Sequence, residues 1–131
     1  GALIGISNDG RFASASRADY AAAAVVVLTQ PVSESKTYEL AGDQSFSMTE
    51  LASEVSRQLG RDIPYRNLTS EDCRAILLGL GLPQMTVDVV IDADTKAIRG
   101  DLDATSRDLN GLIGRPTTTL SNAVRSALRT K

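Results

Sequence analysis

Residues 10–24 run Gly10-Arg11-Phe12-Ala13-Ser14-Ala15-Ser16-Arg17-Ala18-Asp19-Tyr20-Ala21-Ala22-Ala23-Ala24. The pattern predicts the end of a strand, a short polar connection and a helix of small residues. Four consecutive alanines give that helix a nearly flat face, which another layer of backbone can approach closely. No Met precedes the stretch. We therefore expect a piece of a larger protein whose main partner layer lies upstream.

Composition indicates one domain over residues 1–131, long enough for a single modest core. The hydrophobic content of 42% and the charged content of 23% are typical of a soluble globular protein. Fourteen basic residues face sixteen acidic ones, so the net charge is −2. This balance gives no electrostatic reason to expect nucleic acid or an anionic membrane as a partner.

The cellular compartment is suggested by Cys73, the only cysteine of the chain. A lone cysteine forms no internal disulfide, which agrees with a reducing cytoplasm. The longest uncharged apolar run, residues 20–28, is far shorter than the roughly 20 residues that a membrane span needs. We predict a cytoplasmic protein without a membrane partner.

The predicted strands are few and short. Residues 3–6 and 11–15 flank Asn8-Asp9-Gly10, whose residue types favour a turn, so we expect a hairpin there. Residues 36–41 are predicted as a further strand. Residues 63–67 are short and extended, and Pro64 restricts them to an edge or an irregular strand.

The predicted helices are marked by their ends. The first begins at Ser16 or Arg17 and runs to about residue 28. Helix starts are further indicated by Ser47 with Glu50, Thr69 with Asp72, Pro83, Thr105 with Asp108, and Thr118-Thr119. The fold class is therefore α/β, with a few short strands and about five helices.

Catalytic side chains and metal ligands are not evident in the sequence. The chain has no His and one Cys, whereas a structural zinc site takes about four nitrogen or sulfur ligands. Residues 79–84 begin like a dinucleotide-binding fingerprint but follow a predicted helix and lack its final glycine. Tyr20, Tyr38 and Tyr65 each lack the Lys four residues later that typical short-chain dehydrogenases use. We expect neither a metal nor a catalytic residue in this chain.

Four segments carry a resemblance to a known family: residues 9–21, 38–43, 81–83 and 112–120. In this order and spacing they resemble the NmrA-like, atypical short-chain dehydrogenases, in particular their NAD(P)H-dependent quinone oxidoreductases. Each segment alone is weakly specific, but the four in register span nearly the whole chain.

The resemblance implies a protein about twice as long. Its N-terminal Rossmann part would carry the glycine-rich loop and most contacts to NADP, and would be the partner of this chain. The residues present here would supply the last elements of the sheet and a C-terminal substrate lobe. Hydride would pass directly from NADPH to a quinone. Without the glycine-rich loop, we expect this chain alone to be inactive.

The resemblance also implies which residues lie beside the cofactor, namely Ala13, Ser14 and Arg17. Ala13 and Ser14 would offer backbone groups and small side chains near the nicotinamide, and Arg17 would face a phosphate or pair with a carboxylate. The alternatives are structural: a first-turn charge arrangement for Arg17 and Asp19, and a helix N-cap for Ser14 and Ser16.

Two other functions remain open. NmrA-like regulators keep the fold but sense the redox state of NAD(P) and bind a protein partner without turnover. A free-standing α/β interaction module is the third possibility. If the chain is part of a longer protein, the upstream part would cover the alanine face of the first helix and the edge of strand 36–41. Both would be exposed in this chain alone, which predicts self-association.

Overall fold

The fold is described from a computed structural model, over residues 1–31 and 34–129. The chain forms two compact units, each discontinuous in sequence. Unit 1 contains Gly1–Phe12 and Phe46–Asp103, and unit 2 contains the described residues of Ala13–Ser45 and Ala104–Lys131. Since every unit draws on separate segments, no single point of the chain divides them.

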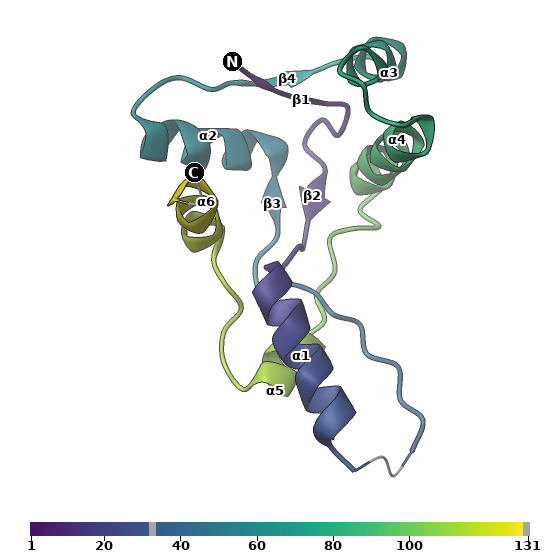
Figure 1. Cartoon of the computed structure of the whole chain (residues 1–131), viewed down its shortest axis with the longest axis vertical. Helices are drawn as coiled ribbons and strands as arrows, with labels where there is room; N and C mark the ends of the chain where they lie inside the picture. Colours follow the sequence, from purple (N-terminus) through teal and green to yellow (C-terminus); the bar gives the residue numbers. More distant parts are fainter. Residues whose placement is uncertain (32–33, 130–131) are drawn as a thin grey trace. The chain divides into compact units, whose positions relative to one another are not determined.

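Unit 1 is built on two pairs of short strands (Figure 1). Strand β1 (Leu3–Gly5) pairs in parallel with β4 (Tyr65–Asn67), and β2 (Arg11–Phe12) pairs antiparallel with β3 (Phe46–Ser47). The predicted hairpin of β1 with β2 is therefore wrong. The turn itself exists, because Gly10 N–H donates to the Ser7 carbonyl at 2.8 Å. After β1, however, the N–H of Ile6 donates to the Asp94 carboxylate at 2.7 Å, and the two strands separate.

Three helices complete unit 1: α2 (Met48–Leu59), α3 (Ser70–Gly79) and α4 (Gln84–Ile98). The predicted capping box is confirmed, since Ser47 accepts from Glu50 N–H and the Glu50 carboxylate accepts from Ser47 N–H. Gly60 ends α2 in the left-handed conformation, at φ 64°, as its position predicted. The hydrophobic core joins α3 and α4 to the residue that follows β1, and its members are Ile6, Cys73, Val87 and Ile91.

The helices of unit 2 are α1 (Arg17–Thr29), α5 (Asp108–Ile113) and α6 (Leu120–Arg129). Figure 1 shows α1 crossing α5, and the two helices are in contact. Ala23 and Leu109 are both fully buried. A methyl side chain at position 23 lets the two helix backbones approach closely, so part of the alanine face has a partner within this chain.

Two predictions for unit 2 are wrong. Residues 36–41 form no strand, and the N–H of Glu39 instead donates to the Asp108 carboxylate at 3.0 Å. Thr105 does not cap α5, which begins at Asp108 after an Arg107 N-cap. The remaining architecture agrees with the α/β prediction, with six helices in the described residues where about five were expected.

Candidate functional site

The beginning of α1 is fixed by hydrogen bonds within residues 15–20. Ser16 is the N-cap, and its hydroxyl oxygen accepts from Asp19 N–H at 3.1 Å. The N–H of Ala15 donates to the Tyr20 hydroxyl at 3.1 Å, which turns the preceding chain toward the helix. The capping role expected as one alternative for Ser14 and Ser16 therefore belongs to Ser16.

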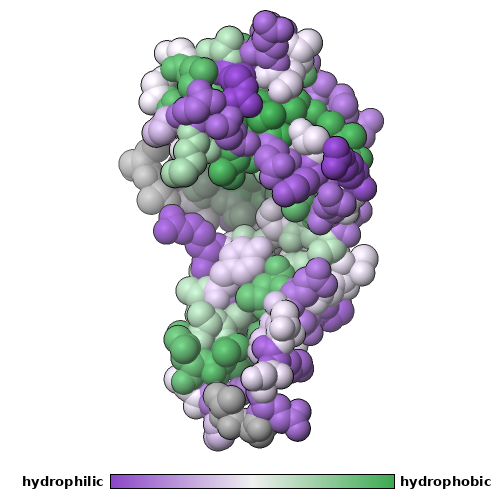
Figure 2. All heavy atoms as spheres, turned by 90° about the vertical axis from the view of Figure 1, so that its right-hand side faces the viewer, coloured by the Kyte–Doolittle hydropathy of each residue, from purple (hydrophilic) through white to green (hydrophobic). Residues whose placement is uncertain are grey.

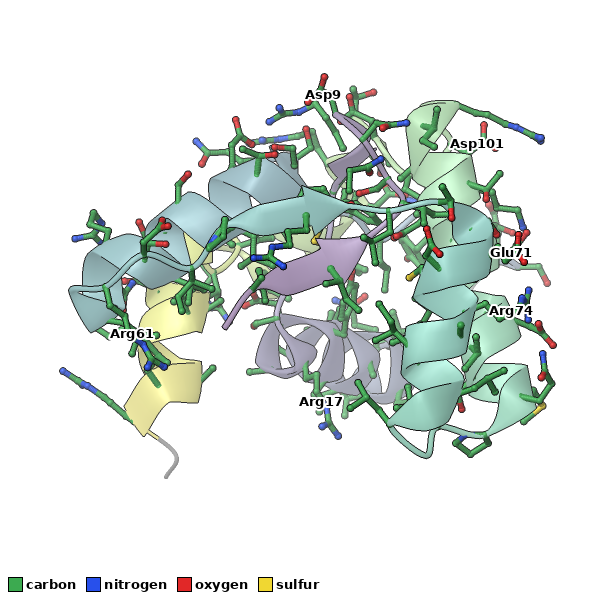
Figure 3. The ribbon with its side chains drawn as sticks, turned by 90° about the horizontal axis from the view of Figure 1, so that it is seen from above. Asp9, Arg17, Arg61, Glu71, Arg74 and Asp101 are labelled. Atoms are coloured by element: carbon green, nitrogen blue, oxygen red, sulfur yellow. The ribbon has the colours of Figure 1, made fainter. Side chains whose placement is uncertain are left out.

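The three predicted site residues lie in or beside this connection, in different surroundings. Ala13 is buried, and its carbonyl oxygen accepts from Gly42 N–H at 2.8 Å. Ser14 and Arg17 are exposed, and neither side chain forms a hydrogen bond or ion pair with the residues that the structure describes. Figure 3 shows Arg17 pointing away from the ribbon. The polar side chains with capacity for a ligand are thus those of Ser14 and Arg17.

The backbone at Gly42 lies against residues 13 and 14. A Cβ atom at position 42 would overlap the carbonyl oxygen of Ser14, so only glycine allows the two backbones to approach this closely. The next N–H, that of Asp43, donates to the Thr117 hydroxyl at 2.8 Å. Segments that are far apart in sequence therefore meet here, and all of them belong to the motifs of the resemblance.

Asp19 is a buried carboxylate with several hydrogen-bond donors around it. Its side chain is 0% exposed. Oδ2 accepts from Thr118 N–H and from the Ser16 hydroxyl, both at 2.8 Å, while Oδ1 lies 2.7 Å from Nη2 of Arg115. Burial alone would raise the pKa of Asp19, but the bonds from Thr118, Ser16 and Arg115 outweigh burial and lower it. Asp19 is therefore ionised in the folded protein at neutral pH.

Asp43 has an environment similar to that of Asp19. Its carboxylate accepts from Thr117, the residue before the Thr118 that binds Asp19. Its Oδ2 accepts from Thr117 N–H at 2.8 Å and from the Asn110 amide at 3.0 Å. Its Oδ1 lies 3.2 Å from Nη1 of Arg107. The hydrogen bonds from Thr117 and Asn110, followed by the Arg107 charge, lower the pKa of Asp43 against the opposing effect of burial.

Sequence reasoning did not identify these two carboxylates as functional residues. It placed Asp19 in the first turn of a helix, where a negative charge faces the helix dipole. The structure adds a partner 96 positions further along the chain, Arg115. The only sequence signal for the other residues of this cluster was their place in the resembling motifs. These residues are Arg115, Thr117, Thr118 and Asp43.

Unit 1 offers less chemistry. Cys73 is buried, and burial raises the pKa of its thiol, which fits a packing residue. An open groove of about 730 Å³ lies between α2 and the segment leading to β4 and contains none of the predicted site residues. Among the described residues, no group of His, Cys, Asp or Glu is arranged to hold a metal ion. Within residues 1–31 and 34–129, each helix is too short or too polar to cross a lipid bilayer.

Comparison with known proteins connects the chain to NAD(P)H-dependent reductases, although no family model matches it. It is 46% identical to quinone oxidoreductase 2 of Escherichia coli over 124 residues, which are 95% of this chain and 43% of that protein. The structure of the NADPH-dependent quinone oxidoreductase of E. coli in complex with NADPH matches with a TM-score of 0.90 and 44% identity, over 97% of this chain and 45% of that one.

A second enzyme with a bound dinucleotide also matches. Triphenylmethane reductase of Citrobacter sp., in complex with NADP(H), has a TM-score of 0.89 and 30% identity over 97% of this chain and 44% of its own. The chain thus spans less than half the length of these relatives. Over this length it is a homologue of E. coli quinone oxidoreductase 2, in agreement with the resemblance carried by its four sequence motifs.

Proposed function

We propose that this chain is the C-terminal part of an NAD(P)H-dependent quinone oxidoreductase, and that it shapes the side of the cleft where cofactor and quinone meet. The observation that carries the proposal is the 46% identity to E. coli quinone oxidoreductase 2 over nearly the whole chain. The similarity to two structures that contain NADPH or NADP(H) supports the choice of cofactor.

The residues beside α1 fit a dinucleotide in part. A phosphate needs charged or hydroxyl donors that are not already used, and Arg17 and Ser14 supply such donors among the described residues. Ala13 contributes differently, because its carbonyl already accepts from Gly42 N–H and its small side chain would leave room near the nicotinamide. The glycine-rich loop that receives a pyrophosphate is not in this sequence, so the other contacts belong to the N-terminal Rossmann part.

The chemistry of this proposal requires little from the side chains described above. Bound NADPH supplies a hydride, which together with one proton from the solvent reduces a quinone to a hydroquinone. Ser14 and Arg17 would bind and orient the dinucleotide, and the backbone around Ala13 would limit the space beside the nicotinamide. A cytoplasmic location and a quinone substrate belong to the same proposal.

The test compares the full-length protein that contains this chain with the 131-residue chain alone. The full-length protein should oxidise NADPH when a quinone is present, and the isolated chain should neither bind NADPH tightly nor reduce the quinone. Quinone reduction by the 131 residues alone would contradict the proposal of a partial site. NADPH binding by the full-length protein without turnover would instead establish the redox-sensing regulator.

A variant links the result to the predicted site. Arg17→Ala in the full-length protein should weaken NADPH binding, because it removes an exposed cation without disturbing a partner in the described residues. Arg66→Ala is the matched control, since Arg66 is an exposed arginine on β4 in unit 1. Equal effects of the two substitutions would argue against a specific role for Arg17.

A further inference from the structure

The connection that carries Ser14 and Arg17 is held at both of its ends. At one end, Gly42 N–H donates to the Ala13 carbonyl, and Asp43 follows Gly42 directly. At the other end, the Ser16 hydroxyl donates to the Asp19 carboxylate at 2.8 Å. Ser14 and Ala15 lie between these two points, so their backbone has little freedom to move.

Both ends are tied to the same short segment of chain. The Asp43 carboxylate accepts the N–H of Thr117, and the Asp19 carboxylate accepts the N–H of Thr118, each at 2.8 Å. Because these N–H groups belong to consecutive residues, one short stretch of backbone holds the two carboxylates near each other. We call Asp19, Asp43, Thr117 and Thr118 the carboxylate clamp.

Two exposed arginines neutralise the negative charges of the Asp19 and Asp43 carboxylates. Arg115 lies 2.7 Å from Asp19, and Arg107 lies 3.2 Å from Asp43. Both arginines are substantially exposed, whereas the Asp19 side chain is 0% exposed and that of Asp43 is 16% exposed. A buried carboxylate that accepts hydrogen bonds at one oxygen and pairs with an arginine at the other is a strong and directional anchor for the backbone around it.

From this geometry we infer that Asp19 and Asp43 are positioning residues for the dinucleotide, which hold Ser14 and Arg17 in the orientation that binds it. The inference rests on the proposed function. Asp19 is too deeply buried to touch a ligand, so it acts through the α1 N-terminus that it fixes. Asp43 acts through Gly42 and the backbone of residues 13 and 14.

Replacement of either carboxylate by its amide isolates this effect. Asp19→Asn keeps the shape of the side chain, and one amide oxygen can still accept from Thr118. The amide NH₂ would then face the Arg115 guanidinium, and both groups are hydrogen-bond donors. Because this contact is unfavourable, the segment 13–17 should become more mobile. Asp43→Asn creates the same conflict with Arg107. Asp88→Asn is the matched control. Asp88 is an exposed carboxylate on α4 of unit 1 and pairs with Arg74 on α3.

The experiment uses the full-length protein and two measurements. The first is NADPH binding with steady-state kinetics: in Asp19→Asn and Asp43→Asn, the Kd and KM for NADPH should rise about tenfold, as expected for a lost hydrogen bond to a charged group. The kcat at saturating NADPH and the KM for the quinone should stay within about twofold. The control Asp88→Asn should change none of these values.

The second measurement is amide hydrogen exchange without cofactor. The N–H groups of residues 15, 117 and 118 should be protected in the wild-type protein and exchange faster in the two variants. If Asp19→Asn does not fold, Arg115→Lys replaces it. That variant keeps the positive charge but loses the planar fork, and it should give the same changes at smaller size.

The outcomes separate the inference from the function beneath it. Unchanged NADPH affinity in folded variants with loosened amides would overturn the positioning role while the proposed function stands. Unchanged amide exchange would overturn the clamp itself. A wild-type protein that does not bind NADPH would overturn the proposed function, and the role of the clamp toward the dinucleotide with it.

Discussion

Gly42 donates its backbone N–H to the carbonyl oxygen of Ala13 at 2.8 Å, and its Cα faces the carbonyl of Ser14. A methyl group at position 42 would overlap that carbonyl, which belongs to backbone and cannot rotate away. Gly42→Ala should therefore destabilise the protein by about 1–3 kcal/mol, measured by thermal or urea unfolding. Gly111→Ala is the control. Position 111 lies within α5 with open space around the added atom, so the same substitution should be neutral or stabilising by up to about 1 kcal/mol.

The stability contributed by Asp19 should depend on pH. Its pKa lies below the ordinary value of 3.8, so around that pH the unfolded chain binds more protons than the folded one. The stabilisation is therefore fully present above the unfolded pKa and is lost as the pH falls through the folded pKa. We expect Asp19→Asn to lower the free energy of unfolding by about 2 kcal/mol at pH 7, with the difference shrinking below about pH 4.

Urea titrations at several pH values measure that difference. Asp9→Asn, in the exposed turn after β1, should stay within about 0.5 kcal/mol of the wild type throughout. A difference for Asp19→Asn that grows as the pH falls would contradict the assignment of an ionised carboxylate.

Leu109 should carry much of the packing of unit 2. It is fully buried on α5, the helix that contacts α1. Leu109→Ala should cost about 2–5 kcal/mol of unfolding free energy through lost apolar contact and the cavity left behind. The same substitution at Leu80, which is 70% exposed, should cost far less. Similar losses at the two sites would show that α5 is not packed as described.

The exposed side of α1 should promote self-association. Ala21, Ala24, Val25 and Leu28 follow helical spacing and are exposed, with Val25 at 61% and Leu28 at 83%. Figure 2 shows apolar side chains gathered in the lower part of the view, where Figure 1 places the end of α1. Sedimentation of the 131-residue chain should reveal oligomers at high concentration, and Leu28→Glu should reduce them.

Leu80→Glu serves as the control for an exposed leucine of unit 1. A strictly monomeric wild-type chain at high concentration would contradict the prediction. The other half of the original expectation, an open edge on strand 36–41, no longer applies, because those residues form no strand.

Local chemistry predicted the helices well, since their ends are decided by neighbours in sequence. Ser47 with Glu50 and Thr69 with Asp72 form the expected capping bonds, and Ser16, one of the two N-cap alternatives, caps α1. Strand pairing could not be predicted in the same way. β1 has an apolar pattern that suits a hairpin as well as a parallel pair, and its true partner, β4, lies about 60 residues away.

The site was predicted through its motifs and not through its contacts. The resemblance selected residues 13–17, where the exposed Ser14 and Arg17 lie, but it gave no reason to connect Asp19 with Arg115 or Asp43 with Thr117. Such pairs form only when segments distant in sequence fold together, and a single sequence carries no record of which pairs meet. The assignment of Ala13, Ser14 and Arg17 to the cofactor stays a prediction.

The chain passes from one unit to the other at residues 12–13, 45–46 and 103–104, which bears on how the protein can be shortened. The chain leaves unit 1 after Phe12 and returns to it at Phe46. These two residues are paired on adjacent antiparallel strands, β2 and β3. A tight two-residue turn suits that geometry. A shortened chain that joins β2 to β3 through such a turn and stops at residue 103 would retain the whole core around Ile6, Cys73, Val87 and Ile91. Unit 1 is thus a candidate for a minimal domain of continuous sequence, with the loop-closure entropy of the excursion removed.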